Sequence, residues 1–299
     1  MAIRFGLVWR GDESPVEVAR RAEDAGYATL LFPDHTGMVA PLPAMAAAAA
    51  VTRTLRVGTQ VVNIAFRPLG ALAQEAAAVD LVSGGRLELG LGAGYAEPEL
   101  RSLGLPFPAT GDRIADVARA LDVLPRLFAG QTVTEEPGPG RLAGFALDPP
   151  PPQGGAVPLL VGGNGDRILA VAAWGASTVQ FTGFTAPPSP ERLSHFTTAG
   201  LADRVDYVRR RAGDRFDRLE LSVFVQHARV VADPRAVAAE LFGDVLPVEQ
   251  ALDSPFLLLG SVEAICDRIR ELRDRFGVSY LTVIDGRAEG FDRVVARLG

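Results

Sequence analysis

Asp34 and His35 are adjacent residues of this 299-residue chain whose types and position could together do chemistry. They follow the run 28–33 (ATLLFP), which has the apolar composition of a buried strand. Histidine exchanges protons near neutral pH, and a neighbouring carboxylate can fix its tautomer or hold its proton. The pair therefore predicts proton transfer at the end of a strand. The alternative is that Asp34 caps a turn and His35 only fills space.

The other candidate ligands and nucleophiles are scattered. His227 follows a later apolar run and could lie at the same end of the fold, whereas His195 lies in a polar stretch and is expected to be solvated. No HxH or HExxH pair occurs, and the single cysteine, Cys266, lies in a helical stretch where packing is its expected role. The sequence therefore predicts no metal site.

Alternate glycines end another strand-like run in GLGAGYAEPE, at Gly90, Gly92 and Gly94. The spacing is GxGxG, which differs from the GxGxxG of dinucleotide-binding folds, and the next segment does not open a clean helix. Two interpretations stay open. The missing side chains could let a flat ring approach the backbone, or they could relieve crowding inside a barrel.

A third glycine-containing turn, VGGNGDRIL, leads from a strand-like run into a helical one. Gly162, Gly163 and the amides near Asn164 could then cradle an anion at a helix N-terminus. The alternative is an ordinary tight turn with an Asn or Asp cap.

Short apolar runs alternate with longer runs of helical period, which is typical of βαβ units and a parallel sheet. Eight such pairs predict a closed (β/α)₈ barrel, with a doubly wound open sheet as the alternative. Strands are expected at 3–9, 28–33, 55–62, 86–92, 158–162, 177–182, 219–226 and 279–284. Helices are expected near 14–25, 41–53, 68–82, 111–129, 164–174, 202–213, 261–276 and 288–298.

Three long connections interrupt the alternation. Segment 130–157 joins a helix to a strand and is expected to plug the bottom of the barrel. Segments 183–201 and 227–260 follow strands, so they should lie over the C-terminal mouth as lids. No boundary suggests a second domain, so residues 1–299 are expected to form one domain.

Composition excludes several classes of function. The net charge is −6, which disfavours a nucleic-acid surface and leaves small molecules as the expected partners. No run reaches the length of a membrane span and the N-terminus does not resemble a signal peptide, so a cytoplasmic location is expected. All 30 basic residues are arginine, and the absence of lysine excludes Schiff-base chemistry and the GK[ST] phosphate loop.

Several of these stretches, taken in order, resemble the luciferase-like flavin and deazaflavin oxidoreductases. They are AEDAGYATLLFPDH, TLRVGTQVV, AAAVDLVSGGRLELGLGAGY, ELRSLGLPFPATGDR, PLLVGGNGDRIL and FLLLGSVEAICDRIRELRDRFGVSYLTVI. The resemblance covers nearly the whole chain and implies a (β/α)₈ barrel whose mouth holds FMN or the deazaflavin coenzyme F420. The short DH loop is more similar to the actinobacterial F420-dependent branch.

The resemblance also assigns roles to residues. His35 would line the deazaflavin ring and could donate a proton, with Asp34 orienting it. The strand end at Gln60 and Val61 matches a place where a non-proline cis peptide often forms a bulge behind the ring. The remaining matched positions are Asn63 (ring or substrate), Ala93, Gly94 and Tyr95 (beside the ring), and Gly162 and Gly163 (phosphate), with Asn164 next to them.

Departures from the sugar-phosphate dehydrogenases of this family narrow the function. Those members have a glutamate where Tyr95 stands, a tryptophan where 36–39 lies, and phosphate-binding lysines. We therefore expect F420-dependent hydride transfer with a small organic substrate of specialised metabolism, and Tyr95 could handle the proton. The alternatives are an FMN-dependent monooxygenase and a non-catalytic ligand-binding barrel. The family often forms dimers, so a homodimer is possible, although the Ala-rich helix could equally be packed within the monomer.

Overall fold

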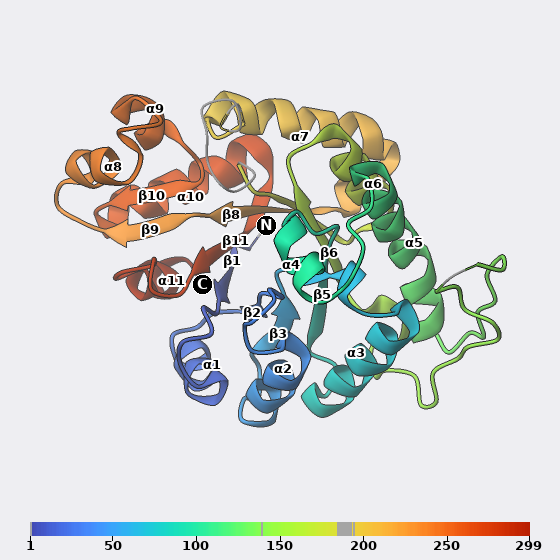
Figure 1. Ribbon diagram of the computed structural model, residues 1–299. Coiled ribbons are helices and arrows are strands. Elements are labelled where there is room, and N and C mark those ends of the chain that lie inside the picture. Colours follow the sequence, from blue (N-terminus) through green and yellow to red (C-terminus); the bar gives the residue numbers. More distant parts are fainter. Residues whose placement is uncertain (1, 139, 184–192, 194) are drawn as a thin grey trace.

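The computed structural model describes residues 2–138, 140–183, 193 and 195–299, and within them eight parallel strands close into a barrel (Figure 1). Strand β4 continues β3, and pairing of both with β5 closes the ring. This confirms the predicted barrel, and the open-sheet alternative is wrong. The barrel strands are β1 (Arg4–Val8), β2 (Thr29–Phe32), β3 (Arg56–Thr59), β4 (Val62–Asn63), β5 (Leu87–Gly92), β6 (Leu159–Gly163), β7 (Thr178–Phe181), β8 (Glu220–Val225) and β11 (Val278–Ile284).

Helices cover the outside of the barrel and match the predicted ranges to within a few residues. They are α1 (Pro15–Asp24), α2 (Pro41–Ala50), α3 (Leu69–Ser83), α5 (Thr110–Phe128), α6 (Asp166–Gly175), α7 (Thr198–Ala212), α10 (Val262–Phe276) and α11 (Asp292–Leu298). The elements that the sequence did not predict are α4 (Glu97–Ser102), β9 (His227–Val230), α8 (Pro234–Phe242), α9 (Val248–Asp253), β10 (Leu257–Gly260) and the 3₁₀ turns η1 (Ile64–Phe66), η2 (Gly154–Ala156) and η4 (Gly213–Arg218).

Two apolar clusters reflect the two faces of the barrel strands. Side chains alternate along a strand, so Leu30 and Phe32 pack with the helices while Leu31 belongs to a separate cluster. That second cluster contains Val8, Leu160 and Tyr280 and fills the barrel interior. Half-buried Val61 and Phe224 pack onto it, so apolar groups continue toward the mouth.

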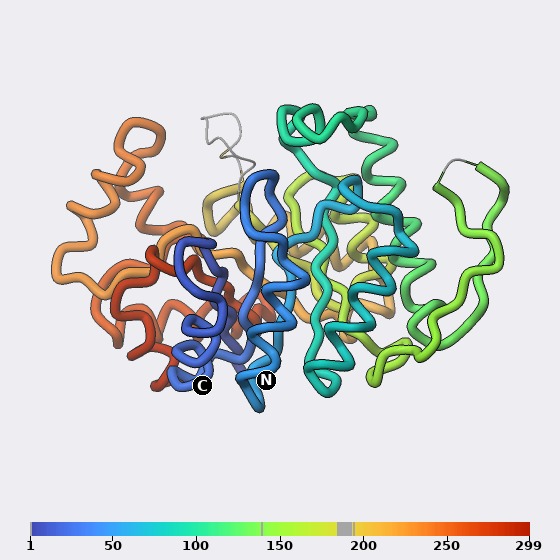
Figure 2. Tube along the Cα trace, turned by 60° about the horizontal axis from the view of Figure 1, so that its bottom comes forward, coloured from blue at the N-terminus to red at the C-terminus, as the bar shows by residue number. Residues whose placement is uncertain are grey.

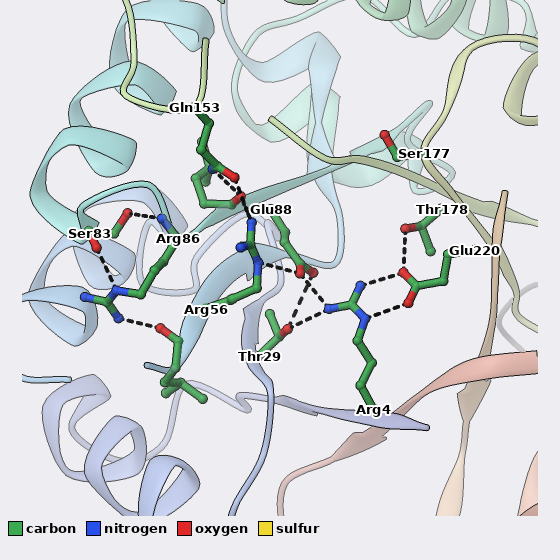
Figure 3. A network of polar contacts seen from close by, with 12 residues as sticks. Arg4, Thr29, Arg56, Ser83, Arg86, Glu88, Gln153, Ser177, Thr178 and Glu220 are labelled. Carbon is green, nitrogen blue, oxygen red and sulfur yellow. Dashed lines mark hydrogen bonds and ion pairs between the residues drawn. The ribbon is translucent and has the colours of Figure 1, made fainter. Parts of the chain in front are cut away.

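A charged network occupies the interior at the N-terminal ends of the strands (Figure 3). Arg4 of β1 donates to both carboxylate oxygens of Glu220 in β8, at 2.7 and 2.6 Å, and lies 2.6 Å from Glu88 of β5. Arg56 of β3 lies 2.7 Å from the same Glu88, and the Arg4 guanidinium stacks 3.6 Å from the centre of the Tyr280 ring. Two arginines and two glutamates thus neutralise one another at the barrel end opposite the mouth, and removal of one partner would leave a buried charge uncompensated.

A bulge interrupts the pairing of β3 and β4 with β5. From Gly58 to Val62 the first chain takes four steps, whereas its partner takes three, from Glu88 to Leu91. In place of the ladder, the Thr59 hydroxyl donates to the carbonyl of Gly90 at 2.7 Å and accepts its N–H at 2.9 Å.

Glycines make room for this bulge. A Cβ on Gly90 would overlap the carbonyl oxygen of Thr59, and one on Gly92 would overlap the Val61 side chain. Of the two interpretations of the GxGxG stretch, the structure therefore supports close packing at Gly90 and Gly92.

The connection at 130–157 only partly plugs the bottom. Gln153 does so, because its side chain donates to Asp80 and to the carbonyl of Leu87 at the start of β5. Residues 133–138 and 140–145 instead lie against the outside of the barrel, where Glu135 pairs with Arg119 of α5 at 2.6 Å (Figure 2). Bottom placement is therefore wrong for this part.

Segment 227–260 forms a side lobe, and it does not cover the mouth as a lid. Strand β9 pairs with β10, and α8 and α9 lie beside them at the edge of the barrel (Figure 1). His227 packs there against Phe242 of α8, and burial together with nearby Arg287 and Arg229 lowers its pKa to about 4. His227 thus lies at the C-terminal end of β8, but its ring packs into this side lobe. Of the other predicted lid, residues 184–192 and 194 lie outside the described residues.

Replacement of Gly90 by alanine should destabilise the barrel. The new methyl group must displace main-chain atoms of Thr59, and we expect a loss of about 2 kcal/mol or more in the free energy of unfolding. The matched control is Gly162→Ala on β6, where the nearest atom to a Cβ is 3.5 Å away. Urea unfolding measures both variants. Equal stability of the two would contradict the packing explanation.

Candidate active site

The predicted site residues lie at the C-terminal ends of β2, β4, β5 and β6, which is where barrel enzymes place their chemistry. Figure 2 shows the segments 33–40 and 93–109 at this end, opposite the turns at 51–55 and 84–86. We call this end the mouth. The tertiary structure thus brings together residues that are up to 130 positions apart in the sequence, from Asp34 to Asn164.

Asp34 is a structural anchor for the neighbouring strand. Its carboxylate accepts the backbone N–H of Asn63 at 3.0 Å and two bonds from the Arg67 guanidinium, at 3.0 and 3.2 Å. Only 8% of Asp34 is exposed. The prediction that Asp34 orients His35 is therefore wrong: its carboxylate holds β4 and Arg67 in place.

His35 takes its carboxylate partner from α4. Its Nδ1 lies 2.8 Å from Oε1 of Glu99, and the side chains are 37% and 24% exposed. The Tyr95 ring meets the imidazole edge to face, with ring centroids 6.1 Å apart. Burial and the charge of Glu99 raise the pKa of Tyr95, so its phenol stays protonated at neutral pH.

The bulge positions Gln60 and Val61 beneath the mouth. The peptide bond between them is cis, as the resemblance implied. The Gln60 side-chain oxygen accepts a bond of 3.2 Å from Gln180 of β7, which also donates to Ser222 and Thr282. The amide nitrogen of Gln60 is buried and has no partner among the described residues.

Asn63 and the end of β5 touch each other. Gly94 has a φ of +68°, and a Cβ there would lie 2.7 Å from the Asn63 amide nitrogen. Arg113 of α5 fixes this strand end, because its guanidinium donates to the carbonyls of Ala93 and Gly94. Arg113 thus fixes Ala93 and Gly94, which precede Tyr95, the residue whose ring contacts His35.

The turn after β6 joins two strands and opens a helix. Asn164 accepts the N–H groups of Thr182 and Gly183 at 3.3 and 3.0 Å, which ties β6 to the end of β7. Its amide nitrogen is buried and has no partner among the described residues. Helix α6 begins two residues later without a side-chain cap, which leaves its first N–H groups available, with Gly162 and Gly163 beside them.

Next to this turn, Arg204 of α7 forms ion pairs with two aspartates. It lies 2.5 Å from Asp166 and from Asp203 and donates to the carbonyl of Asn164. His195 is half-buried, and burial together with Arg204 lowers its pKa. His195 is therefore only partly solvated, where the sequence predicted a solvated residue.

Sequence reasoning missed Glu99, Arg67 and Arg113. The stretch EPELR gave a usable signal for Glu99, because a proline in the first turn after a glycine-rich strand end is typical of a short helix. The two arginines gave none, since the groups that they hold at the mouth, Asp34 and the carbonyls of Ala93 and Gly94, lie at least 19 positions away along the chain.

Two further classes of site are not found in the described part of the chain. No group of three or more His, Cys, Asp or Glu side chains there could hold a metal ion. Among the helices described, none is both long and apolar enough to cross a membrane.

Replacement of Asp34 by alanine tests its anchoring role. The change leaves Arg67 and the Asn63 N–H without their acceptor, and we expect a loss of about 3 kcal/mol in unfolding free energy. Glu75→Gln is the control, because this exposed residue lies 3.8 Å from the same Arg67 and should change stability little. An Asp34→Ala protein as stable as the wild type would contradict the anchoring role.

Known proteins share both the fold and stretches of the sequence. An F420-dependent glucose-6-phosphate dehydrogenase of Beutenbergia cavernae is 37% identical over 123 residues, which is 38% of this chain and only 36% of the dehydrogenase. The 4-hydroxyprotoasukamycin monooxygenase of Streptomyces nodosus subsp. asukaensis is 30% identical over 93% of this chain and 81% of its own length.

Among solved structures, an F420-dependent secondary alcohol dehydrogenase in complex with an F420-acetone adduct matches with a TM-score of 0.78. The match covers the whole of both chains at 17% identity, so it shows the fold. The family model described as luciferase-like monooxygenase matches residues 13–255. The chain therefore belongs to the luciferase-like monooxygenase family.

Proposed function

We propose that this protein is an oxidoreductase that transfers a hydride between coenzyme F420 and a small, fairly apolar organic substrate. The observation that carries the proposal is His35, whose Nδ1 is bonded to a carboxylate and whose Nε2 has no partner among the described residues. Such an imidazole can exchange one proton per hydride transferred. The F420-dependent names of the dehydrogenase and of the solved structure support the cofactor.

The residues of the mouth fit a large planar cofactor with a phosphate tail. Buried amide nitrogens of Gln60 and Asn164 lack partners among the described residues, and an unpartnered buried donor is costly unless a ligand or water satisfies it. The uncapped start of α6 offers N–H groups suited to an anion. Gln60, Val61, Asn63, Ala93 and Gly94 would then line the ring, and Gly162, Gly163 and Asn164 would hold the phosphate.

Bound F420 would supply a two-electron hydride carrier. The chain's own contribution is to bind, orient and exchange a proton. His35 would exchange it through Nε2, because Nδ1 is held by Glu99. Tyr95, whose phenol stays protonated, can donate a hydrogen bond to a substrate oxygen beside the imidazole.

The substrate class follows from the mouth's side chains. Val61 and Phe224 are half-buried and continue the apolar interior cluster upward. The chain has no lysine to hold a substrate phosphate, and Arg204, which donates to the Asn164 carbonyl at the α6 turn, is already neutralised by two aspartates. These features favour a neutral organic substrate over a sugar phosphate.

A flavin monooxygenase is the second candidate, because the monooxygenase relative matches 93% of this chain. Reduced FMN reacts with oxygen, whereas the deazaflavin largely does not. The two proposals therefore differ in cofactor affinity and in oxygen consumption.

Titration of the purified protein with F420 and with FMN tests the proposal. We expect quenching of F420 fluorescence with a dissociation constant at least tenfold lower than that for FMN, and no oxygen consumption. His35→Ala should retain F420 binding, while turnover of a small alcohol or carbonyl compound falls about 100-fold. Tighter FMN binding with oxygen uptake would overturn the proposal in favour of the monooxygenase. Binding of neither cofactor would favour a non-catalytic barrel.

We also propose that two copies associate through α2 and α3. Helix α2 (PLPAMAAAAA) has no charged residue, so even its outward face is apolar, which is unusual for a surface helix. On α3, Leu81 and Val82 are 59% and 50% exposed, and an apolar groove of about 340 Å³ runs between the helices. A second copy presenting the same surface would bury this patch symmetrically.

Sedimentation of a charged variant tests this association. Leu81→Glu combined with Val82→Glu should convert a dimer to a monomer, because four carboxylates would then face one another across the symmetric interface. The control is Trp174→Glu on α6, which is 57% exposed on another side of the barrel. A monomeric wild-type protein, or a double variant that stays dimeric, would exclude this surface.

A further inference from the structure

We propose that Glu99 is the positioning residue for His35: it fixes the imidazole as the Nδ1–H tautomer and holds the charge that the ring gains with a second proton. The inference rests on the proposed function for its catalytic consequence. Its structural part stands on the contacts of α4 alone.

The tautomer follows from the chemistry of the two partners. An ionised carboxylate only accepts hydrogen bonds, so the 2.8 Å contact requires His35 Nδ1 to be the donor. In the neutral imidazole the other nitrogen, Nε2, then carries the lone pair. Nε2 is therefore the atom that takes a proton from a substrate hydroxyl or returns one to a carbonyl oxygen.

Glu99 is held in place from several directions. The Thr36 hydroxyl, next to His35, donates to its carbonyl at 3.3 Å, and Ser102 donates to the same carbonyl at 2.8 Å. The following residue, Leu100, is 1% exposed and anchors α4 on the barrel. The carboxylate is thus presented to the imidazole by a packed helix that is tied to the DH turn.

Glu97, on the same helix, is a comparison for Glu99 because it makes no contact with His35. It points to solvent, with 45% of its side chain exposed, and pairs with Arg101 at 2.7 Å one turn further along α4. Residues two apart lie on different sides of a helix, so only Glu99 reaches the mouth. No basic side chain among the described residues pairs with Glu99, which leaves its charge for His35 and Tyr95.

The adjacent Asp34 cannot take this role, because both its oxygens are bonded to Arg67 or to the Asn63 N–H. The adjacent Asp34 and His35 therefore do not act as a pair, although their adjacency in the sequence suggests that they do. Asp34 holds the strand, and the histidine is held by Glu99, which lies 64 residues beyond it in the chain.

In the direction of substrate oxidation, bound F420 would supply the acceptor for the hydride that leaves the substrate carbon. His35 Nε2 would take the hydroxyl proton, so that a C–H and an O–H bond break and a carbonyl group forms. The imidazolium would then lie beside the Glu99 carboxylate, and in the reverse direction Nε2 would return the same proton.

Nitrogen NMR of the cofactor-free protein tests the positioning role directly. The chain has three histidines, so the signals of His35 are identified by their loss in His35→Ala. We expect a protonated Nδ1 and an unprotonated Nε2 in the wild type near pH 8. Glu99→Ala should shift the ring toward the Nε2–H tautomer, whereas Glu97→Ala should leave its nitrogen shifts unchanged. An Nε2–H wild type, or an unchanged ring in Glu99→Ala, would overturn the inference.

Kinetics separate this inference from the proposed function. With F420 bound, Glu99→Ala should lower kcat about tenfold or more with an unchanged dissociation constant for F420, and Glu97→Ala should match the wild type. Glu99→Gln preserves the shape of the side chain, so it controls for misfolding of Glu99→Ala. The new amide can donate a hydrogen bond to His35 Nδ1, which favours the Nε2–H tautomer. We therefore expect Glu99→Gln to lose activity as well. Full activity in Glu99→Gln and Glu99→Ala, with His35→Ala impaired, would reject the positioning role but keep the function. If F420 does not bind at all, the function fails and the NMR result still decides the contact.

Discussion

Closure of the barrel between β3 and β5 is the constraint on which the rest of the mouth depends. The segment β3–β4 has one residue more than the β5 segment that it pairs with, so the regular hydrogen bonds between the strands are interrupted there. The Thr59 hydroxyl takes their place, because it bonds to both the N–H and the carbonyl of Gly90. A side chain on Gly90 would occupy the space of the Thr59 carbonyl. The bulge then turns Gln60 and Val61 toward the mouth, and the Asp34 carboxylate holds the strand where it resumes at Asn63.

The two ends of the barrel use charge in opposite ways. At the bottom, Arg4 and Arg56 are matched by Glu88 and Glu220, so each charge is satisfied within the protein. At the mouth, buried amide nitrogens and one imidazole nitrogen are left without partners among the described residues. A satisfied network contributes rigidity, whereas unsatisfied donors and acceptors are what a ligand can use. Buried hydroxyls of Ser279 and Tyr280 also lack a partner among the described residues at the bottom, so what distinguishes the mouth is that its unpartnered amides lie at the strand ends that carry His35.

The family relationship and the side chains inform different parts of the proposal. Membership in the luciferase-like family accounts for the barrel, and relatives of the chain carry both dehydrogenase and monooxygenase names. The choice of a neutral substrate comes instead from this chain's own composition and from half-buried apolar groups such as Phe224. The proton relay comes from α4, a short helix whose Glu99 meets His35.

The sequence by itself determined the eight strands, their helices and the end of the barrel at which Asp34, His35 and the glycine turns lie. It could do so because strand and helix periods are local, and a parallel barrel places every strand's C-terminus at one end. Only the tertiary structure decided which carboxylate serves the histidine. From residue type alone, Asp34 and Glu99 could each be the partner of His35. Both oxygens of Asp34 are bonded to Arg67 or to the Asn63 N–H, however. Helix α4 instead places Glu99, 64 residues beyond His35 in the chain, against the imidazole. Hydrogen-bond partners depend on distances between segments far apart in the chain, and such distances are set by packing.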